Sequence, residues 1–227
     1  MSRFARVVVP EFPHHVTQRG NAKRDVFYTT ADRLVYLRLL RRYAEFYSLR
    51  VLGYCVMTNH VHLVVIPGFE ESLAKAMREV HGRYAQYRNA IEQQSGHVWQ
   101  NRFYSCPFEP IRLANVLRYV ELNPVRAGLT QAAEDYAWSS AVMHLGGPDP
   151  IGLLDLEEWK RGWSPAEWAD VLGSGPEDSR AIRQATFGGR PLGSELFVAG
   201  LEKKLDRKLA KSRPGRKPEK TQSLAAG

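Results

Sequence analysis

Two histidines separated by a single residue give the first indication of chemistry in this sequence. His60 and His62 belong to the apolar, β-branched segment 60–66, whose composition predicts a strand. Side chains alternate along a strand, so His60, His62, Val64 and Ile66 share one face. Two imidazoles at this spacing lie close enough to bind one metal ion, and imidazole suits Mn, Zn, Fe or Ni. Taken alone, the pair is weak evidence for a metal site, because strand histidines at this spacing are more often simply exposed or hydrogen-bonded.

A second spacing appears in a helix predicted from Arg112 to Leu122, which Asn123-Pro124 should end. Tyr119 and Asn123 lie four residues apart and therefore one above the other. They share a polar stripe that lies beside an apolar stripe of the same helix. The polar stripe consists of Arg112, Asn115, Tyr119 and Asn123, and the apolar stripe of Leu113, Val116, Leu117 and Val120. If the apolar stripe packs over Val64 and Ile66, Tyr119 and Asn123 lie beside the histidines. Without the histidines, a tyrosine at a packing interface and a helix-end asparagine would explain both residues.

Together the four side chains predict a particular chemistry. A metal ion can act as a Lewis acid on a phosphate oxygen, and a tyrosine oxygen can attack the phosphorus to give a covalent phosphotyrosine. Such an intermediate keeps the energy of the broken phosphodiester, so a strand can be transferred without an external energy source. No glycine-rich phosphate loop, serine elbow or paired-carboxylate motif competes for this role.

The elements that must position these residues alternate between strands and helices. The order through residue 111 is β-α-β-β-α-β, which predicts an α+β, ferredoxin-like sheet with both helices on one face. The other face is then open and needs a ligand or another element to cover it. The predicted elements are strand 14–19, a helix from Thr29/Thr30 to Tyr47, strand 50–57, a turn at Thr58-Asn59, strand 60–66, helix 72–94, strand 103–111 and the added helix 112–122.

Charge is distributed unevenly along the 227 residues. Residues 1–130 carry 18 Lys/Arg against 10 Asp/Glu, residues 131–200 carry 5 against 11, and residues 201–227 carry 9 against 3. A basic body and a basic tail suit a polyanionic partner, because neutralised phosphates release counterions. Cys55 and Cys106 form no CxxC pair and are expected to be packed thiols. No apolar run is long enough to cross a bilayer or serve as a signal peptide, so we expect a cytoplasmic, nucleoid-associated protein.

Four sequence blocks carry a family resemblance. They are residues 12–21 (FPHHVTQRGN), 54–62 (YCVMTNHVH), 96–103 (GHVWQNRF) and 119–128 (YVELNPVRAG). In this order they resemble the REP-associated tyrosine transposases, which are single-tyrosine endonucleases with the HUH motif (His, hydrophobic, His). The resemblance covers about residues 12–145 and includes Trp138-Ser139-Ser140.

The resemblance implies a Mg²⁺- or Mn²⁺-dependent nuclease that nicks single-stranded DNA beside an imperfect, REP-like hairpin. It implies His60 and His62 as metal ligands, Tyr119 as the nucleophile and Asn123 as an amide ligand. Related transposases often have glutamine at the last position, so the shorter asparagine puts direct coordination in doubt. Tyr84 and Tyr87 are rival nucleophiles, although both lie on the core-like face of the long helix.

Further residues are candidates for DNA contacts. Arginines that flank the site in sequence are expected to hold phosphates, and two aromatic residues are expected to stack on an unpaired base. The phosphate candidates are Arg19, Arg24, Arg102 and Arg112, and the stacking candidates are Trp99 and Phe103. Each of them alone is better explained as a surface charge or a core aromatic.

We divide the chain into a nuclease domain (1–145), an irregular linker (146–178) with a short helix near Ser164 to Leu172, a helical basic extension (179–210) and a disordered basic tail (211–227). The extension contains Arg190 in a glycine-rich turn and is either a DNA-binding accessory or a packing element. The tail contains Arg216 in a run that resembles a minor-groove-binding arm.

Two other functions remain alternatives. The first is a noncatalytic single-stranded nucleic-acid-binding module, since such sheets also bind RNA through exposed aromatics. The second is a metal-dependent hydrolase that activates water, with Tyr119 structural. Monomer and homodimer also remain alternatives.

Overall fold

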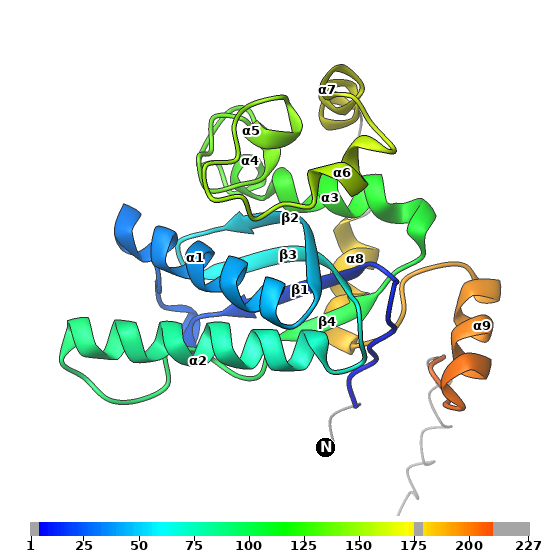
Figure 1. The fold of residues 1–227 in the computed structure, drawn as a ribbon, viewed down its shortest axis with the longest axis horizontal. Coiled ribbons are helices and arrows are strands. Elements are labelled where there is room, and N and C mark those ends of the chain that lie inside the picture. The colour runs from blue at the N-terminus through cyan, green and yellow to red at the C-terminus, as the bar shows by residue number, and fades with distance from the viewer. Residues whose placement is uncertain (1–4, 175–178, 211–227) are drawn as a thin grey trace, which may run out of the picture.

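A four-stranded antiparallel sheet lies at the centre of the computed structural model, which describes residues 5–174 and 179–210 (Figure 1). The strands lie in the order β2-β3-β1-β4, so that β1 and β3 are central. Through β4 the chain follows the β-α-β-β-α-β order predicted from the sequence. The strands are β1 (His14–Arg19), β2 (Leu49–Val56), β3 (His60–Pro67) and β4 (Tyr104–Pro107).

Helices of very different lengths surround this sheet. The two longest, α1 and α2, come before β4 in the chain, and shorter ones follow it. The helices are α1 (Thr30–Phe46), α2 (Ser72–Glu92), α3 (Leu113–Glu121), α4 (Asn123–Arg126), α5 (Ala141–His144), α6 (Leu156–Lys160), α7 (Pro165–Gly173), α8 (Ser179–Gly188) and α9 (Glu195–Leu205), with short 3-10 helices at Asn21–Lys23 and Pro110–Arg112.

The helices α1 and α2 pack together on one face of the sheet. Val61, Leu63 and Val65 of β3 are fully buried in the core between these helices and the sheet. The alternation predicted for β3 is therefore confirmed.

Helix α1 begins at a capping box, in which Thr29 accepts a hydrogen bond from the backbone of Asp32 and the Asp32 carboxylate accepts one from the backbone of Thr29.

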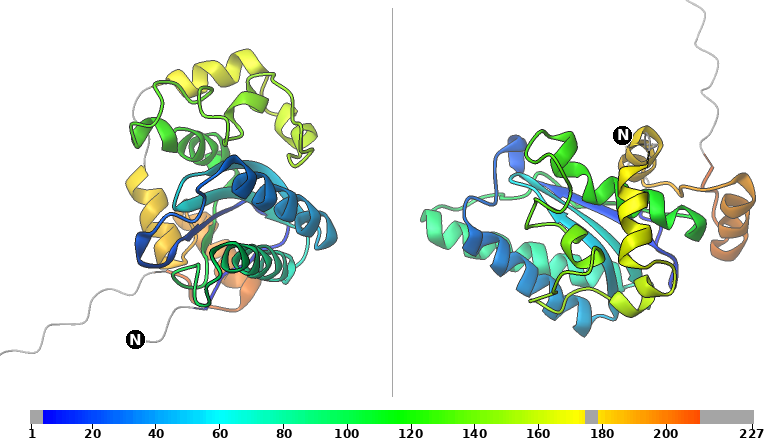
Figure 2. Two further views of the ribbon diagram at one scale, coloured as in Figure 1. Left: turned by 90° about the vertical axis from the view of Figure 1, so that its left-hand side faces the viewer. Right: turned by 90° about the horizontal axis from the view of Figure 1, so that it is seen from above.

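The opposite face of the sheet is covered by other elements. Val64 of β3 packs with Leu117 and Val120 of α3 in a second core, as the apolar stripe of that helix predicts. Gly53 of β2 allows the close approach, because a Cβ atom there would lie 2.5 Å from Leu117 Cδ2. Figure 2 shows α3 and the segment after it on the side of the sheet away from α2. The face predicted to be open is thus partly closed by the chain itself.

The segment predicted as an irregular linker is packed on this second core. Helices α6 and α7 lie within it, and α7 corresponds to the short helix predicted there. Trp159 and Trp168 are buried beside residues of α3. Two large indoles cover too much apolar surface to remain in a solvated connection, so this segment is packed up to residue 174, while the domain boundaries stay a prediction.

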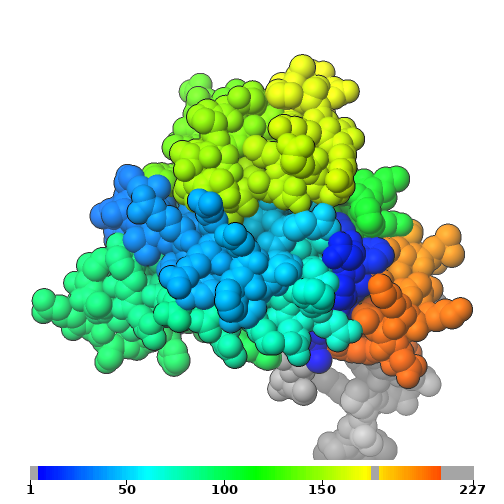
Figure 3. All heavy atoms as spheres, in the orientation of Figure 1, coloured from blue at the N-terminus to red at the C-terminus, as the bar shows by residue number. Residues whose placement is uncertain are grey.

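The C-terminal helices pack back on the sheet and on the N-terminal segment. Helix α8 lies against β4 and β1. Helix α9 packs with the chain before β1, where Leu201 is buried with Val7 and Val9. In Figure 3, α9 (orange) lies beside this N-terminal segment (blue). The prediction for residues 211–227 lies outside the described residues.

Some boundaries differ from the predicted ones. Strand β4 covers only Tyr104–Pro107, because Pro107 has no backbone N–H for a longer ladder and Pro110 begins a 3-10 helix. The helix expected to stop at Asn123 instead continues after Leu122 as the short α4, with Pro124 in its first turn. In residues 5–174 and 179–210 no helix has the length and apolar character of a membrane span.

Candidate active site

The predicted histidines and tyrosine line one pocket. Its volume is about 540 Å³, and it lies where the ends of β1 and β3 meet α3, α4 and α8. His60, His62, Tyr119 and Asn123 all contribute to its wall. The structure therefore brings together the residues that two separate spacings singled out.

The two histidines present different hydrogen-bonding environments. Asn59 Nδ2 donates to the Lys23 carbonyl, so Asn59 Oδ1 faces His60 Nδ1 at 2.6 Å. An amide oxygen can only accept, so His60 Nδ1 donates and Nε2 keeps its lone pair. His62 Nδ1 lies 2.9 Å from His15 Nε2. In both rings Nδ1 is occupied by a protein partner, which leaves Nε2 as the candidate metal-binding atom.

The site favours neutral imidazoles. Burial, together with the positive charge of Arg19, lowers the pKa of His60 to about 4. Burial also lowers the pKa of His62 well below its usual value, and nearby histidines and arginines act in the same direction. Since a metal binds the unprotonated ring, both side chains are in the ligating form at neutral pH.

Tyr119 lies directly beside His62. The ring centroids are 5.6 Å apart with an interplanar angle of 89°, and His15 stands in a similar relation at 5.5 Å. The tyrosine is only 3% exposed. The Arg126 guanidinium lies 4.5 Å from the centre of its ring and donates to the Tyr119 carbonyl at 2.5 Å. These contacts hold the phenol ring in a fixed position next to the candidate metal ligands.

The orientation of Asn123 follows from its hydrogen bonds. Its Nδ2 donates to the carbonyls of Tyr119 at 3.0 Å and Val120 at 3.2 Å. Because both partners are acceptors, the amide nitrogen must face the helix, and Oδ1 is the atom left for a metal ion or a bridging water. The amide side chain thus also closes the last turn of α3.

The rival tyrosines lie on the other side of the sheet. Tyr84 is fully buried in the core beneath α1 and α2, and its hydroxyl donates to the Val26 carbonyl at 2.6 Å. Burial raises its pKa far above the ordinary value. The Tyr87 hydroxyl donates to Asp32, whose negative charge together with partial burial raises the tyrosine pKa. Neither residue lines the histidine pocket.

A divalent metal ion fits the donor atoms present. Across the described ranges, His, Cys, Asp and Glu side chains nowhere gather in groups of three that would form an all-protein metal site. The available donors are two imidazole nitrogens and one amide oxygen, a set that leaves positions for water or phosphate oxygens. That is the arrangement expected of a metal ion that acts on a bound phosphodiester.

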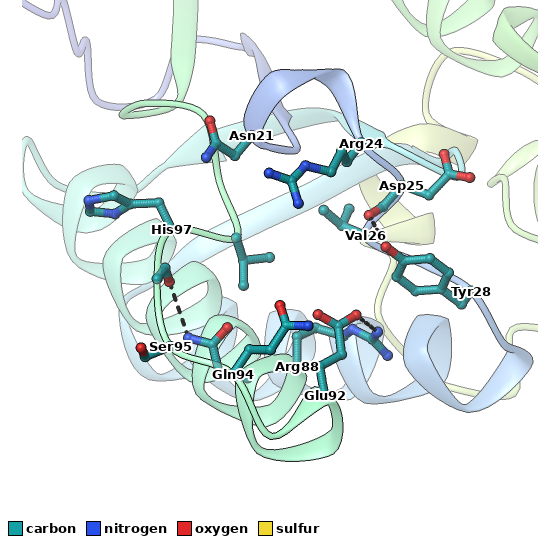
Figure 4. A pocket seen from close by; sticks show the side chains of 13 residues that line it. Asn21, Arg24, Asp25, Val26, Tyr28, Arg88, Glu92, Gln94, Ser95 and His97 are labelled. Carbon is teal, nitrogen blue, oxygen red and sulfur yellow. Dashed lines mark hydrogen bonds and ion pairs between the residues drawn. The ribbon is translucent and has the colours of Figure 1, made fainter.

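The predicted DNA-contact residues fall into separate places. Arg19 lies in the histidine pocket. Arg24 lines a different pocket of about 310 Å³ between the loop 94–98 and the segment 21–28, and Figure 4 shows its guanidinium directed into that space. Arg102 and Phe103 line a third, more apolar pocket of about 660 Å³. One of the four predicted phosphate contacts therefore adjoins the histidines.

Trp99 belongs to the core. It is 8% exposed, its indole N–H donates to the His81 carbonyl at 2.9 Å, and its ring packs against Tyr36 and Tyr84. The other stacking candidate, Phe103, has the Arg6 guanidinium 3.6 Å from its ring centre. Neighbouring aromatic side chains cover most of the indole, but Trp99 also lines the pocket that contains Arg102 and Phe103, so base stacking by Trp99 stays a prediction.

Arg112 and Arg190 do not line the histidine pocket. Arg112 ends the 3-10 helix before α3 and does not line the pocket. Arg190 donates to the carbonyls of Leu209 and Ala210, so its guanidinium holds the end of the described chain. Arg216 lies outside the described residues.

The sequence analysis missed four residues close to the site. Arg126 and Arg183 line the pocket and add positive charge, while Gln100 adds a polar group. His15 contacts His62 through a ring nitrogen. The position of Arg126 seven residues after Tyr119, two helical turns on, is a signal that could have identified it. Arg183 and Gln100 have no local signal, because distant packing brings them to the pocket.

Comparisons with known proteins identify relatives of this chain. A solved structure described as a REP-associated tyrosine transposase bound to a REP hairpin has the same fold, with a TM-score of 0.55, 18% identity, and coverage of 66% of this chain and 90% of that one. A Haemophilus influenzae protein described as a REP-associated tyrosine transposase is 27% identical over an alignment of 113 residues, with a coverage of 42% of this chain. The match spans 61% of that relative's length. The family model described as "Transposase IS200 like" matches residues 9–123, about half of the chain. This protein therefore belongs to the IS200-like transposase family.

Proposed function

We propose that this protein is a metal-dependent single-stranded DNA endonuclease and strand transferase that cuts beside hairpins through a covalent phosphotyrosine. The observation that carries the proposal is the position of the Tyr119 ring, perpendicular to the His62 ring at a centroid distance of 5.6 Å in one basic pocket. A nucleophile and two metal-ligand candidates then face the same bound phosphodiester.

In the proposed reaction the Tyr119 oxygen forms a bond to phosphorus while the bond from phosphorus to the neighbouring sugar oxygen breaks. The proton that the Tyr119 hydroxyl loses passes to solvent, the leaving sugar oxygen takes up a proton from solvent and becomes a free hydroxyl, and the strand that carries the phosphate stays attached to the protein. A divalent metal, which this family implies, would supply Lewis-acid stabilisation of the phosphate when bound by His60, His62 and, directly or through water, Asn123. We propose Mg²⁺ or Mn²⁺ for this role.

Positive charge around the pocket supports a phosphate-bearing substrate. Arg19, Arg126 and Arg183 line it, and none of the lining residues identified in the described chain is acidic. Guanidinium groups suit phosphate because they offer several N–H donors in a planar fork. We propose that these three arginines hold the phosphates next to the cut, a role for which only Arg19 was singled out from the sequence.

A route for the rest of the strand follows from shared pocket walls. Gln100 lines both the histidine pocket and the pocket that contains Arg102 and Phe103. A smaller pocket of about 80 Å³ is lined by Arg102 and Phe103 as well as by Tyr104 and Phe187. The last two residues also line the histidine pocket and so connect the two. We propose that unpaired nucleotides beside the hairpin follow these connected surfaces, with Arg102 on a phosphate. The related structure bound to a REP hairpin supports hairpin DNA as the partner class.

The experiment is a denaturing gel with end-labelled hairpin oligonucleotides incubated with protein and Mn²⁺. We expect label to stay on the wild-type protein and to be absent from Tyr119→Phe. Tyr87→Phe is the matched control, since it removes the hydroxyl of the rival tyrosine and should still form the adduct. Cleavage without an adduct would identify a hydrolase, and binding without cleavage would identify a noncatalytic module; either result overturns the proposal.

A further inference from the structure

A chain of buried side chains connects the C-terminal helix α8 to the candidate metal ligand His62. Thr186 of α8 contacts His15 of β1, and His15 contacts His62 of β3. We infer that Thr186 and His15 are positioning residues that fix His62 in the tautomer with its hydrogen on Nδ1 and its lone pair on Nε2, ready for the metal. The inference deepens the proposed function and rests on it for the role of the metal.

The direction of the first hydrogen bond is set at Thr186. Its Oγ1 lies 2.8 Å from the carbonyl oxygen of Ile182. Two oxygens approach this closely only with a hydrogen between them, and a carbonyl has none to give, so the threonine hydroxyl is the donor. The hydroxyl has a single hydrogen, which is then committed to the helix backbone. Towards its other neighbours Thr186 Oγ1 therefore offers only lone pairs.

The lone pairs of Thr186 Oγ1 determine which ring nitrogen of His15 carries the hydrogen. His15 Nδ1 lies 2.7 Å from Thr186 Oγ1 and must donate the hydrogen of that contact. Cys106 Sγ lies 3.3 Å from the same oxygen, where a thiol hydrogen can occupy the second lone pair. His15 is 1% exposed, and in the described part of the chain its ring nitrogens contact Thr186 and His62 rather than a carboxylate, so the ring is neutral and carries one hydrogen. With that hydrogen on Nδ1, His15 Nε2 is an acceptor.

Because His15 Nε2 accepts a hydrogen bond, it also determines the tautomer of His62. His62 Nδ1 lies 2.9 Å from His15 Nε2, and the two ring planes differ by only 6° with centroids 5.1 Å apart, an arrangement that a hydrogen bond lying in both ring planes can adopt. His62 Nδ1 must then donate, and the lone pair of the neutral His62 ring is on Nε2. If these hydrogen bonds had the opposite direction, His62 Nε2 would carry a hydrogen and could not bind a metal.

The arrangement depends on segments far apart in sequence. His15 lies opposite Val64 in the β1–β3 register, diagonal to His62 on the same face. Thr186 lies 171 residues after His15 and outside the family-matched segment 9–123. The C-terminal extension is thereby assigned a role at the active site that its basic composition did not predict.

The decisive test uses Thr186→Val, which keeps the branched shape and removes the hydroxyl. Long-range ¹H–¹⁵N NMR spectra of the metal-free protein report which ring nitrogen of His62 carries the hydrogen. We expect the hydrogen on Nδ1 in wild type and in Thr186→Ser, and a partial or complete shift to Nε2 in Thr186→Val. Cys106→Ala, which removes the other neighbour of Thr186, is the matched control and should resemble wild type.

Binding of Mn²⁺ provides the second measurement, by titration calorimetry or by electron paramagnetic resonance. Loss of such an outer partner typically weakens metal binding about 10- to 100-fold, so we expect Thr186→Val to fall in that range and Thr186→Ser to stay near wild type. A protonated Nε2 on His62 in the wild type, or Mn²⁺ affinity unchanged in Thr186→Val, would overturn the inference. Wild-type protein with the expected tautomer that forms no DNA adduct would instead overturn the proposed function alone.

Discussion

The rings of Tyr119 and His62 stand at 89° to each other with their centroids 5.6 Å apart, although 57 positions separate the two residues in the chain. The contact joins α3 to β3 across the second core of the protein. The proposed function requires the Tyr119 hydroxyl to reach the phosphate that a metal ion on His62 would contact. The predictions below test this relationship and the packing that maintains it.

Removing the Tyr119 hydroxyl should separate chemistry from metal binding. In Tyr119→Phe we expect the rate of hairpin cleavage to fall at least about a thousandfold, because loss of a covalent nucleophile removes the reaction path. Mn²⁺ affinity, measured by calorimetry, should stay unchanged, because the candidate metal ligands are imidazole nitrogens and an amide oxygen and do not include the Tyr119 hydroxyl. His62→Ala is the comparison variant and should lose metal binding. Residual cleavage near the wild-type rate would assign the nucleophile elsewhere.

Arg126 should act mainly on DNA binding. Its guanidinium lies 4.5 Å from the Tyr119 ring centre at the pocket wall. In Arg126→Ala we expect weaker binding of single-stranded DNA and a slope of log affinity against log salt that is smaller by about one, as for the loss of one phosphate contact. Fluorescence anisotropy at several salt concentrations measures both. Arg161→Ala is the control, since Arg161 pairs with Glu158 on the exposed α6 segment. Identical slopes in the two variants would contradict a phosphate contact.

Glu121 should support the helix that carries Tyr119. Its carboxylate is fully buried and accepts hydrogen bonds from Ser140 Oγ at 2.5 Å, His144 Nδ1 at 2.6 Å and Trp168 Nε1 at 2.8 Å. Glu121→Gln replaces one acceptor oxygen by a donor, so we expect the free energy of unfolding to fall by about 3 kcal/mol. Chemical denaturation measures this loss. The exposed Glu157→Gln should change stability little, and equal stability in the two variants would show that the buried cluster is not important.

Stability should decrease as the solution is acidified, in part through His81. Burial, reinforced by the charge of Arg6, lowers the pKa of His81 from 6.5 to about 3. Between these values the unfolded chain binds the proton and the folded chain does not, so His81 contributes stability that is present above pH 6.5 and is lost as pH falls towards 3.

The measurement for His81 is the free energy of unfolding at a series of pH values from 7 to 4. In His81→Gln we expect the decrease over this range to be smaller than in wild type, by up to about 1.4 kcal/mol for each pH unit below 6.5. The difference in slope is the informative quantity, because the substitution also changes the baseline stability. Parallel slopes would mean that the folded protein protonates His81 near its ordinary pKa.

Local spacing in the sequence determined a large part of this protein. Alternation along β3 placed His60 and His62 on the face of Val64, and helical spacing placed Tyr119 one turn before Asn123 beside an apolar stripe. These assignments hold because the periods of strands and helices are properties of the backbone itself. The order of strands and helices through β4 follows from the same patterns.

Only the tertiary structure decided which distant segments meet the site. The β1–β3 register brings His15 beside His62, and the packing of α8 brings Thr186 to His15 and Arg183 to the pocket. It also assigns Trp99 to the core. The physical reason is that a side-chain pattern records which face of an element is buried, whereas the identity of the covering segment depends on packing between residues far apart in the chain.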